Sequence, residues 1–240
     1  MRFITVISLT VVSMALFAKI SPAQTIQRTS TRSSGTLSSS DMSGGLKEAL
    51  FQGVHHAVDD LGRENGFLDN SRVRIPLPSG LRRTEKVLRA AGQGQRVDAF
   101  IASMNHAAEK AVPVALNVFL DSIKQMTFTD AKNILFSGQQ DAATQFFRRT
   151  SEDRLREMFR PIVQDATEQV GVTQQYKQMI GRYGAFGKMF GQDASDIDGY
   201  VTQKALDGLF LLVADEEAKI RRDPLGQTTS ILRRVFGGGR

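Results

Sequence analysis

The sequence predicts an all-α protein, a single multi-helix, bundle-like domain with one short extended strap. After residue 44, apolar side chains recur every three or four positions through most of the chain, which is the spacing of one buried helix face. The interruptions between these periodic stretches contain glycine or proline, the residues that most often end helices. Residues 73–78 differ, because their apolar residues alternate and two prolines disfavour a central strand, which predicts the strap.

The first 23 residues have the features of a cleavable signal peptide. A positive start precedes an apolar run over residues 3–17, and the small side chains of Ser21 and Ala23 occupy the positions that a signal peptidase reads. A retained membrane anchor is the alternative, but Lys19 interrupts the run before it reaches the length of a span, about 20 residues. We therefore expect a signal peptide over residues 1–23 and export of the mature chain.

A tether and then one folded domain are expected after the signal peptide. Serine and threonine dominate residues 24–43, and such a composition buries too little apolar surface to fold, which predicts a disordered tether. A single helical domain then extends over residues 44–237, since no later stretch has the composition of a linker. Its first helix has an apolar stripe between residues 46 and 61 and is expected to end before residues 65–66.

The longest expected helix covers residues 96–126 and contains Pro113, whose ring clashes with the preceding turn, so a kink or break is expected there. A shorter helix near residues 78–92 precedes it, with Val87 and Leu88 among its apolar residues. The remaining periodic stretches predict helices over residues 129–136 (with Thr129 as N-cap), 141–147, 151–158 (with a bend at Pro161), 171–183, 196–222 and 228–236.

The composition narrows the possible chemistry and partners. The chain contains no cysteine, which excludes a lipoprotein anchor, disulfides, thiolate metal sites and a thiol nucleophile. Its net charge of +6 falls to +4 without the signal peptide, because residues 1–23 contain Arg2 and Lys19 and no acidic residue. The remaining basic residues are dispersed and an exported protein rarely meets nucleic acid, so no nucleic-acid partner is expected. Attraction to anionic lipids or cell-wall polymers stays open.

Standard catalytic and cofactor motifs are missing from the sequence. Residues 92–94 lack the third glycine of a dinucleotide loop, and residues 184–188 are too short for a phosphate-binding loop. Two of the three histidines, His55 and His56, are adjacent and diverge by about 100° on a helix, which is a poor arrangement for binding one metal ion. Neither a cofactor nor a metal site is therefore expected.

Three polar residues intrude on the apolar faces of two expected helices, and a fourth can pair with one of them. Asn105 and Glu109 lie one turn apart on one shoulder of the long helix, and Glu217 lies inside the stripe of the last long helix. A buried carboxylate needs a partner, so the structural interpretation pairs Glu217 with Arg221, one turn further on. In the same interpretation, Asn105 and Glu109 bond the backbone that Pro113 releases. The functional interpretation is a polar pocket, lined by all four, for a ligand or for acid–base chemistry.

Seven segments of the chain carry a resemblance to a known family. They are residues 45–50, 65–70, 73–78, 104–111, 141–144, 200–210 and 216–221. In this order they resemble the helical bacterial proteins catalogued as domain of unknown function 4197. The resemblance implies a signal-bearing protein in the periplasm of a Gram-negative bacterium, and it implies no activity, substrate or cofactor, since the family has none established. The chain departs from the family at His106, where an arginine or a similar residue is expected.

The favoured function is non-catalytic binding of an envelope partner or an apolar ligand, in a cavity or groove between the helices that carry Glu109 and Glu217. One alternative is a periplasmic hydrolase or lyase that uses these two carboxylates, which would have to converge in a solvent-reachable cleft. Another is a peripheral membrane protein that binds an anionic surface through the short basic helix expected over residues 228–236. An enzyme is the less favoured class, and the oligomeric state stays open.

Overall fold

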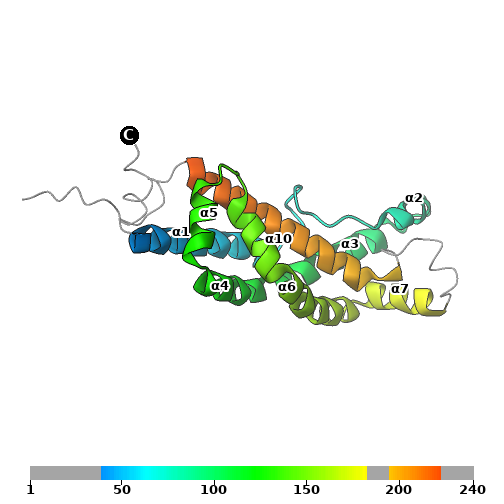
Figure 1. Ribbon diagram of the computed structural model, residues 1–240. Helices are drawn as coiled ribbons and strands as arrows, with labels where there is room; N and C mark the ends of the chain where they lie inside the picture. Colours follow the sequence, from blue (N-terminus) through cyan, green and yellow to red (C-terminus); the bar gives the residue numbers. More distant parts are fainter. Residues whose placement is uncertain (1–38, 183–194, 223–240) are drawn as a thin grey trace, which may run out of the picture. The chain divides into compact units, whose positions relative to one another are not determined.

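The structure, a computed structural model, describes residues 39–182 and 195–222 of the chain. Within these two ranges the regular secondary structure is helical, without a strand, so the predicted all-α fold is confirmed. The helices in Figure 1 are α1 (Ser39–Gly62), α2 (Arg82–Ala90), α3 (Gly94–Ala111), α4 (Ala115–Gln125), α5 (Phe128–Phe136), α6 (Ala142–Glu168), α7 (Gly171–Arg182) and α10 (Ile197–Arg222), with 3₁₀ turns η1 (Ser79–Leu81) and η2 (Val112–Val114). The expected signal peptide and the expected helix over residues 228–236 lie outside the described residues.

The core of the domain is built around α10. This helix packs against α6, α1 and α3, and α6 in turn contacts α3 and α4 (Figure 1). Buried aromatic rings join three of these helices: Phe119 of α4 meets Phe147 of α6 edge to face at 4.9 Å between ring centroids, and Phe210 of α10 at 6.0 Å. Such pairs add to the free energy gained by burying the rings. The contacts fix the helices that carry the candidate residues.

Pro113 interrupts the long predicted helix, as expected from its missing N–H and its ring. The α-helix α3 ends at Ala111, the 3₁₀ turn η2 carries Pro113, and α4 begins at Ala115. Because a 3₁₀ turn is tighter than an α-helical one, the chain absorbs the proline without leaving the core. The break lets α4 pack against both α1 and α6.

The predicted strap is extended and lies on the core. Val73 and Ile75 are buried, and the residues that alternate with them are exposed, which is the pattern of a strand with one face on the core. The Tyr200 hydroxyl of α10 donates a hydrogen bond to the Pro76 carbonyl at 3.0 Å. The strap is thus held by side chains of neighbouring helices.

Two predicted helix boundaries were wrong. Serine and threonine are typical of disordered segments, but they are also favoured at the first positions of a helix. α1 begins at Ser39, inside the predicted tether of residues 24–43, and serine is a favoured residue at a helix start. The N-cap of α5 is Thr127 and not Thr129. The Thr127 hydroxyl accepts the N–H of Asp130 at 3.1 Å, and the Asp130 carboxylate accepts the N–H of Thr127 at 3.0 Å. This reciprocal capping box determines where α5 begins.

The helices expected over residues 141–147 and 151–158 are one continuous helix, α6. The polar stretch between them does not end the helix, and within it the Thr150 hydroxyl donates to the Phe146 carbonyl at 2.9 Å, one turn earlier, a bond that Thr can make inside a helix. α6 also continues through Pro161. Its length brings one helix into contact with α3, α4, α5, α7 and α10.

Candidate functional site

Asn105 lies on α3 and is fully buried. Its Oδ1 accepts a hydrogen bond from the Ile75 N–H at 2.8 Å, and its Nδ2 donates to the Ile75 carbonyl at 2.9 Å. Nδ2 also donates to the Ile101 carbonyl, one turn earlier on α3, at 2.8 Å. The side-chain amide therefore gives the strap the pair of main-chain bonds that a neighbouring strand would give it.

Glu109 lies one turn further along α3, and 5% of its surface is exposed. Its Oε1 accepts the N–H groups of Phe67 at 3.0 Å and Leu68 at 3.2 Å, and its Oε2 accepts that of Asn65 at 3.2 Å. The Nδ1 of His106 lies 2.8 Å from Oε2. Main-chain N–H groups that converge in a turn form a site for an anion. Here the carboxylate of the chain itself occupies that site.

The structural interpretation of Asn105 and Glu109 was correct that they bond main-chain groups, and it was wrong about which main-chain groups these are. The two side chains bond main-chain groups, but these belong to the connection between residues 65 and 75 and not to the turn around Pro113. The reason is that η2 takes up the proline within the helix itself, as described above, whereas the connection after α1 has N–H groups that no helix satisfies. Both residues thus fasten this connection onto α3.

Glu217 of α10 bonds the first turn of α6, and 4% of its surface is exposed. Its carboxylate accepts the N–H groups of Ala143 at 2.9 Å and Thr144 at 2.8 Å, together with the Thr144 hydroxyl at 2.9 Å. The predicted ion pair is confirmed, since Arg221 Nη2 lies 2.6 Å from Glu217 Oε1. The same Nη2 donates to the Ile134 carbonyl of α5 at 3.0 Å. One ion pair therefore joins α5, α6 and α10.

The four candidates form two separate groups. Asn105 and Glu109 hold the connection after α1, whereas Glu217 and Arg221 hold the ends of α5 and α6. In the described part of the chain no residue bonds both carboxylates. The ring of Phe67, whose N–H bonds Glu109, meets α10 at Gly208. Glu217 lies nine residues after Gly208 on α10, which is a distance of roughly 13 Å along the helix axis. Phe67 itself is fully buried.

Sequence reasoning missed a third buried carboxylate, that of Glu216. Lys219 Nζ lies 2.5 Å from its Oε1, and His56 Nδ1 lies 3.6 Å from its Oε2. The hydrogen bond to Glu216 raises the pKa of Lys219 above its ordinary value. The i,i+3 spacing of Glu216 and Lys219 is a signal that the sequence does contain. The partner His56 comes from α1, and no sequence pattern points to it.

Within the described ranges, every buried side-chain nitrogen and oxygen has a hydrogen-bond partner. Among the same residues, no group of three or more histidine, aspartate or glutamate side chains is arranged to hold a metal ion. None of the described helices is both long and apolar enough to cross a membrane. The buried polar groups are therefore matched to one another and to the backbone.

A family model matches residues 36–237, and its description is "Protein of unknown function (DUF4197)". The chain belongs to this family. The match includes every described helix and agrees with the resemblance that the seven segments carry. No curated protein and no solved structure matches the chain. Membership of DUF4197 establishes the lineage of the domain, and its function has to be argued from the geometry.

Proposed function

We propose that this DUF4197 chain is an exported, non-catalytic protein that binds a component of the cell envelope through its surface. The observation that carries the proposal is the use of its buried polar side chains. Asn105, Glu109 and Glu217 each bond main-chain groups of a distant segment, so they hold the fold together. Because these polar groups hold the fold together, the exposed faces are the favoured place for binding.

The bonding of the two carboxylates argues against the hydrolase or lyase alternative. A general acid or base must reach the proton that it transfers, either directly or through one water molecule. The Glu109 carboxylate already accepts three main-chain N–H groups and contacts His106, and Glu217 accepts two N–H groups, a hydroxyl and the Arg221 guanidinium. Because both are almost fully buried, a substrate would have to displace structural bonds to reach either one.

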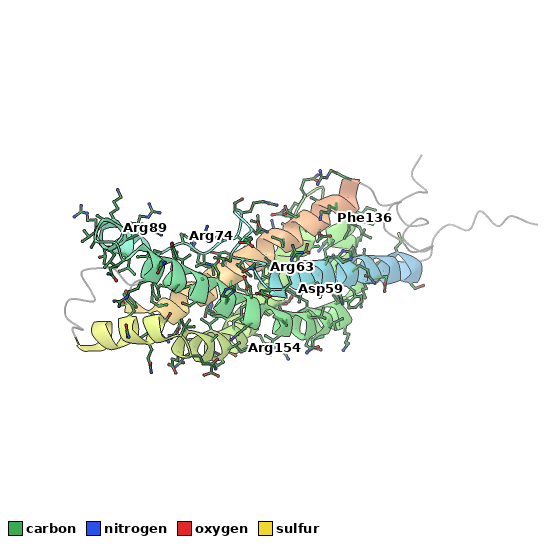
Figure 2. The ribbon with its side chains drawn as sticks, turned by 180° about the vertical axis from the view of Figure 1, so that it is seen from behind. Asp59, Arg63, Arg74, Arg89, Phe136 and Arg154 are labelled. Carbon is green, nitrogen blue, oxygen red and sulfur yellow. The ribbon has the colours of Figure 1, made fainter. Side chains whose placement is uncertain are left out.

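The exposed apolar side chains support binding at the surface. Val87 of α2 is 67% exposed and Phe136 of α5 is 66% exposed. Figure 2 shows Phe136 at the outside of the bundle, at the end of α5. Apolar side chains that are this exposed lose contact with water when a partner covers them, which favours association.

Export is proposed from the sequence of residues 1–23 and tested by fractionation. The expected result is a periplasmic protein whose N-terminal residue is Gln24, read by intact mass and N-terminal sequencing. A variant without residues 2–23 should remain in the cytosol. A full-length chain that stays cytosolic would contradict this part of the proposal.

Surface binding is tested by site-specific photo-cross-linking in the living cell. A photoreactive phenylalanine analogue replaces Val87 or Phe136, and the matched control places it at Glu64, an exposed polar position of the same domain. We expect discrete protein or lipid adducts from the apolar positions and none from Glu64. Native mass spectrometry of the periplasmic protein provides the second readout, because a stoichiometric small molecule retained inside the domain would replace surface binding with the apolar-ligand alternative.

A further inference from the structure

α2 is a helix without a buried residue. Val87 is 67% exposed and Leu88 is 38% exposed, although the sequence pattern places both on the apolar side of the helix. α2 packs mainly against α3 and η1, and Figure 1 shows it on the outer side of α3. Val87 therefore faces solvent, and Leu88 is partly covered without entering the core.

The exposed surface of α2 is divided into an apolar side and a basic side. At about 100° per residue, Arg82, Lys86 and Arg89 fall within a narrow sector, and the apolar residues fall opposite to them. We call the apolar side together with the unpaired basic residues the α2 surface. Its members are Arg82, Arg83, Thr84, Lys86, Val87, Leu88 and Ala91.

One exposed ion pair links α2 to α3, and the other basic residues of α2 stay available. Arg89 Nε lies 3.0 Å from Glu85, and Arg89 Nη2 lies 2.7 Å from Asp98 of α3, so this residue anchors the helix. The same hydrogen bond to Arg89 lowers the pKa of Asp98, which keeps the anchor charged. Among the described residues, no carboxylate forms an ion pair with Arg82, Arg83 or Lys86.

Positive charge is concentrated around this helix. Residues 72–98 contain seven lysine or arginine residues and two acidic residues. Arg72 is paired with Asp215 of α10, and Arg89 with Glu85 and Asp98, so the other five basic residues have no ion-pair partner among the described residues. Figure 2 shows Arg74 and Arg89 on the outer side of the bundle, close to the strap and α2. A surface of this kind attracts an extended anionic partner.

We infer that the α2 surface docks on an anionic phospholipid bilayer, which names the envelope component and rests on the surface-binding function proposed above. An amphipathic helix with a basic polar side and exposed apolar residues lies in the interface of such a bilayer, and each basic residue near the surface adds attraction. A protein partner fits less well, since a stable interface buries about 800 Å² on each partner and α2 has two large apolar side chains.

Vesicle flotation of the full mature chain, residues 24–240, tests the inference. Vesicles of phosphatidylglycerol and phosphatidylcholine are compared with vesicles of phosphatidylcholine alone. The test variant is Arg82→Gln/Arg83→Gln/Lys86→Gln, and the control variant, Arg63→Gln/Lys110→Gln/Lys132→Gln, removes the same charge from exposed positions outside α2. A third variant, Val87→Ser/Leu88→Ser, keeps the charge and removes the apolar side chains. Because α2 has no fully buried residue and the control positions are exposed, all variants should stay close to the wild-type melting temperature.

The wild type should bind only the anionic vesicles, and less strongly as salt rises. The α2 triple variant should lose about tenfold or more in partition coefficient, the Val87/Leu88 variant should lose severalfold, and the control should stay within about threefold of the wild type.

Equal losses in the two triple variants, or a wild type that does not bind, would overturn the inference. Loss of binding on truncation after Leu225, with the α2 variant unaffected, would overturn it in favour of the C-terminal residues. Cross-links from position 87 to protein without vesicle binding would overturn the lipid inference and leave surface binding standing. Absence of vesicle binding together with absence of cross-links from both position 87 and position 136 would end both proposals.

Discussion

The carboxylate of Glu217 on α10 accepts the N–H of Thr144, at the start of α6, at 2.8 Å. The residue at the N-cap position of α6, Asp141, makes no side-chain capping bond, so Glu217 caps this helix from outside its own sequence. A negative charge at a helix N-terminus is favourable because of the exposed N–H groups and the helix dipole. Arg221 does the opposite at the C-terminal end of α5, where its positive guanidinium donates to the Ile134 carbonyl.

Replacing Glu217 should destabilise the protein more than any surface substitution. Glu217→Ala leaves two buried N–H groups without an acceptor and removes the carboxylate that neutralises the partly buried Arg221 guanidinium, so the free energy of unfolding should fall by about 3–5 kcal/mol. Glu217→Gln keeps one acceptor and the shape, and should cost about 1–3 kcal/mol. Urea unfolding measures both. Glu157→Ala, at an exposed position of α6, is the control and should stay within about 0.5 kcal/mol of the wild type. A Glu217→Ala variant as stable as this control would contradict the capping role.

Replacing Asn105 should release the strap. Asn105→Ala leaves the buried N–H and carbonyl of Ile75 without partners, so the free energy of unfolding should fall by about 2–4 kcal/mol. Hydrogen exchange at the Ile75 amide gives the local readout, and it should become faster relative to amides in the middle of α6. Asn133→Ala, at an exposed position of α5, is the matched control and should alter neither quantity. If the Ile75 amide kept its protection in Asn105→Ala, the strap would be held by other contacts.

Helices and the local ion pair could be predicted from the sequence because both depend on residues close in the chain. The 3.6-residue period places the apolar residues of most helices, and Glu217 and Arg221 are one turn apart on the same helix. Pro113 could be identified as a break for the same reason, since its effect on the backbone is local.

The tertiary partners could not be predicted, because they lie far away in the sequence. Glu109 bonds N–H groups more than forty residues earlier, and Glu217 bonds N–H groups more than seventy residues earlier. A pattern indicates that a buried carboxylate needs donors, but it does not indicate which distant N–H groups lack an acceptor. The exposure of Val87 is similar, because the period predicts an apolar face and only the neighbouring helices decide whether it is covered.

Gly208 should not tolerate a methyl group. A Cβ added at this position of α10 would lie 2.8 Å from the Phe67 ring and 3.2 Å from Val73 Cβ, and both neighbours are buried. Gly208→Ala should therefore lower the free energy of unfolding by about 1–3 kcal/mol, against the gain in helix propensity. Adding Phe67→Leu should recover part of the loss, which a double-mutant cycle measures as non-additivity. Gly44→Ala, in α1 with open space around it, is the control and should be neutral or stabilising. Equal effects at the two glycines would show that the Phe67 contact does not require glycine.

The capping box of α5 should make stability depend on pH through Asp130. Hydrogen bonds from the hydroxyl and the N–H of Thr127 lower the pKa of Asp130 below its ordinary value. A carboxyl group with a lowered pKa in the folded state contributes stability above its unfolded pKa of about 4, and that contribution is lost as the pH falls through the folded value. Asp130→Asn should therefore cost about 0.5–1 kcal/mol at pH 7, a modest amount because solvent screens the box. The difference from the wild type should shrink as the pH is lowered below 4, measured by urea unfolding at a series of pH values. The control Glu157→Gln should show no such trend, and a difference for Asp130→Asn that stays constant from pH 7 to pH 3 would remove the ionised carboxylate from the explanation.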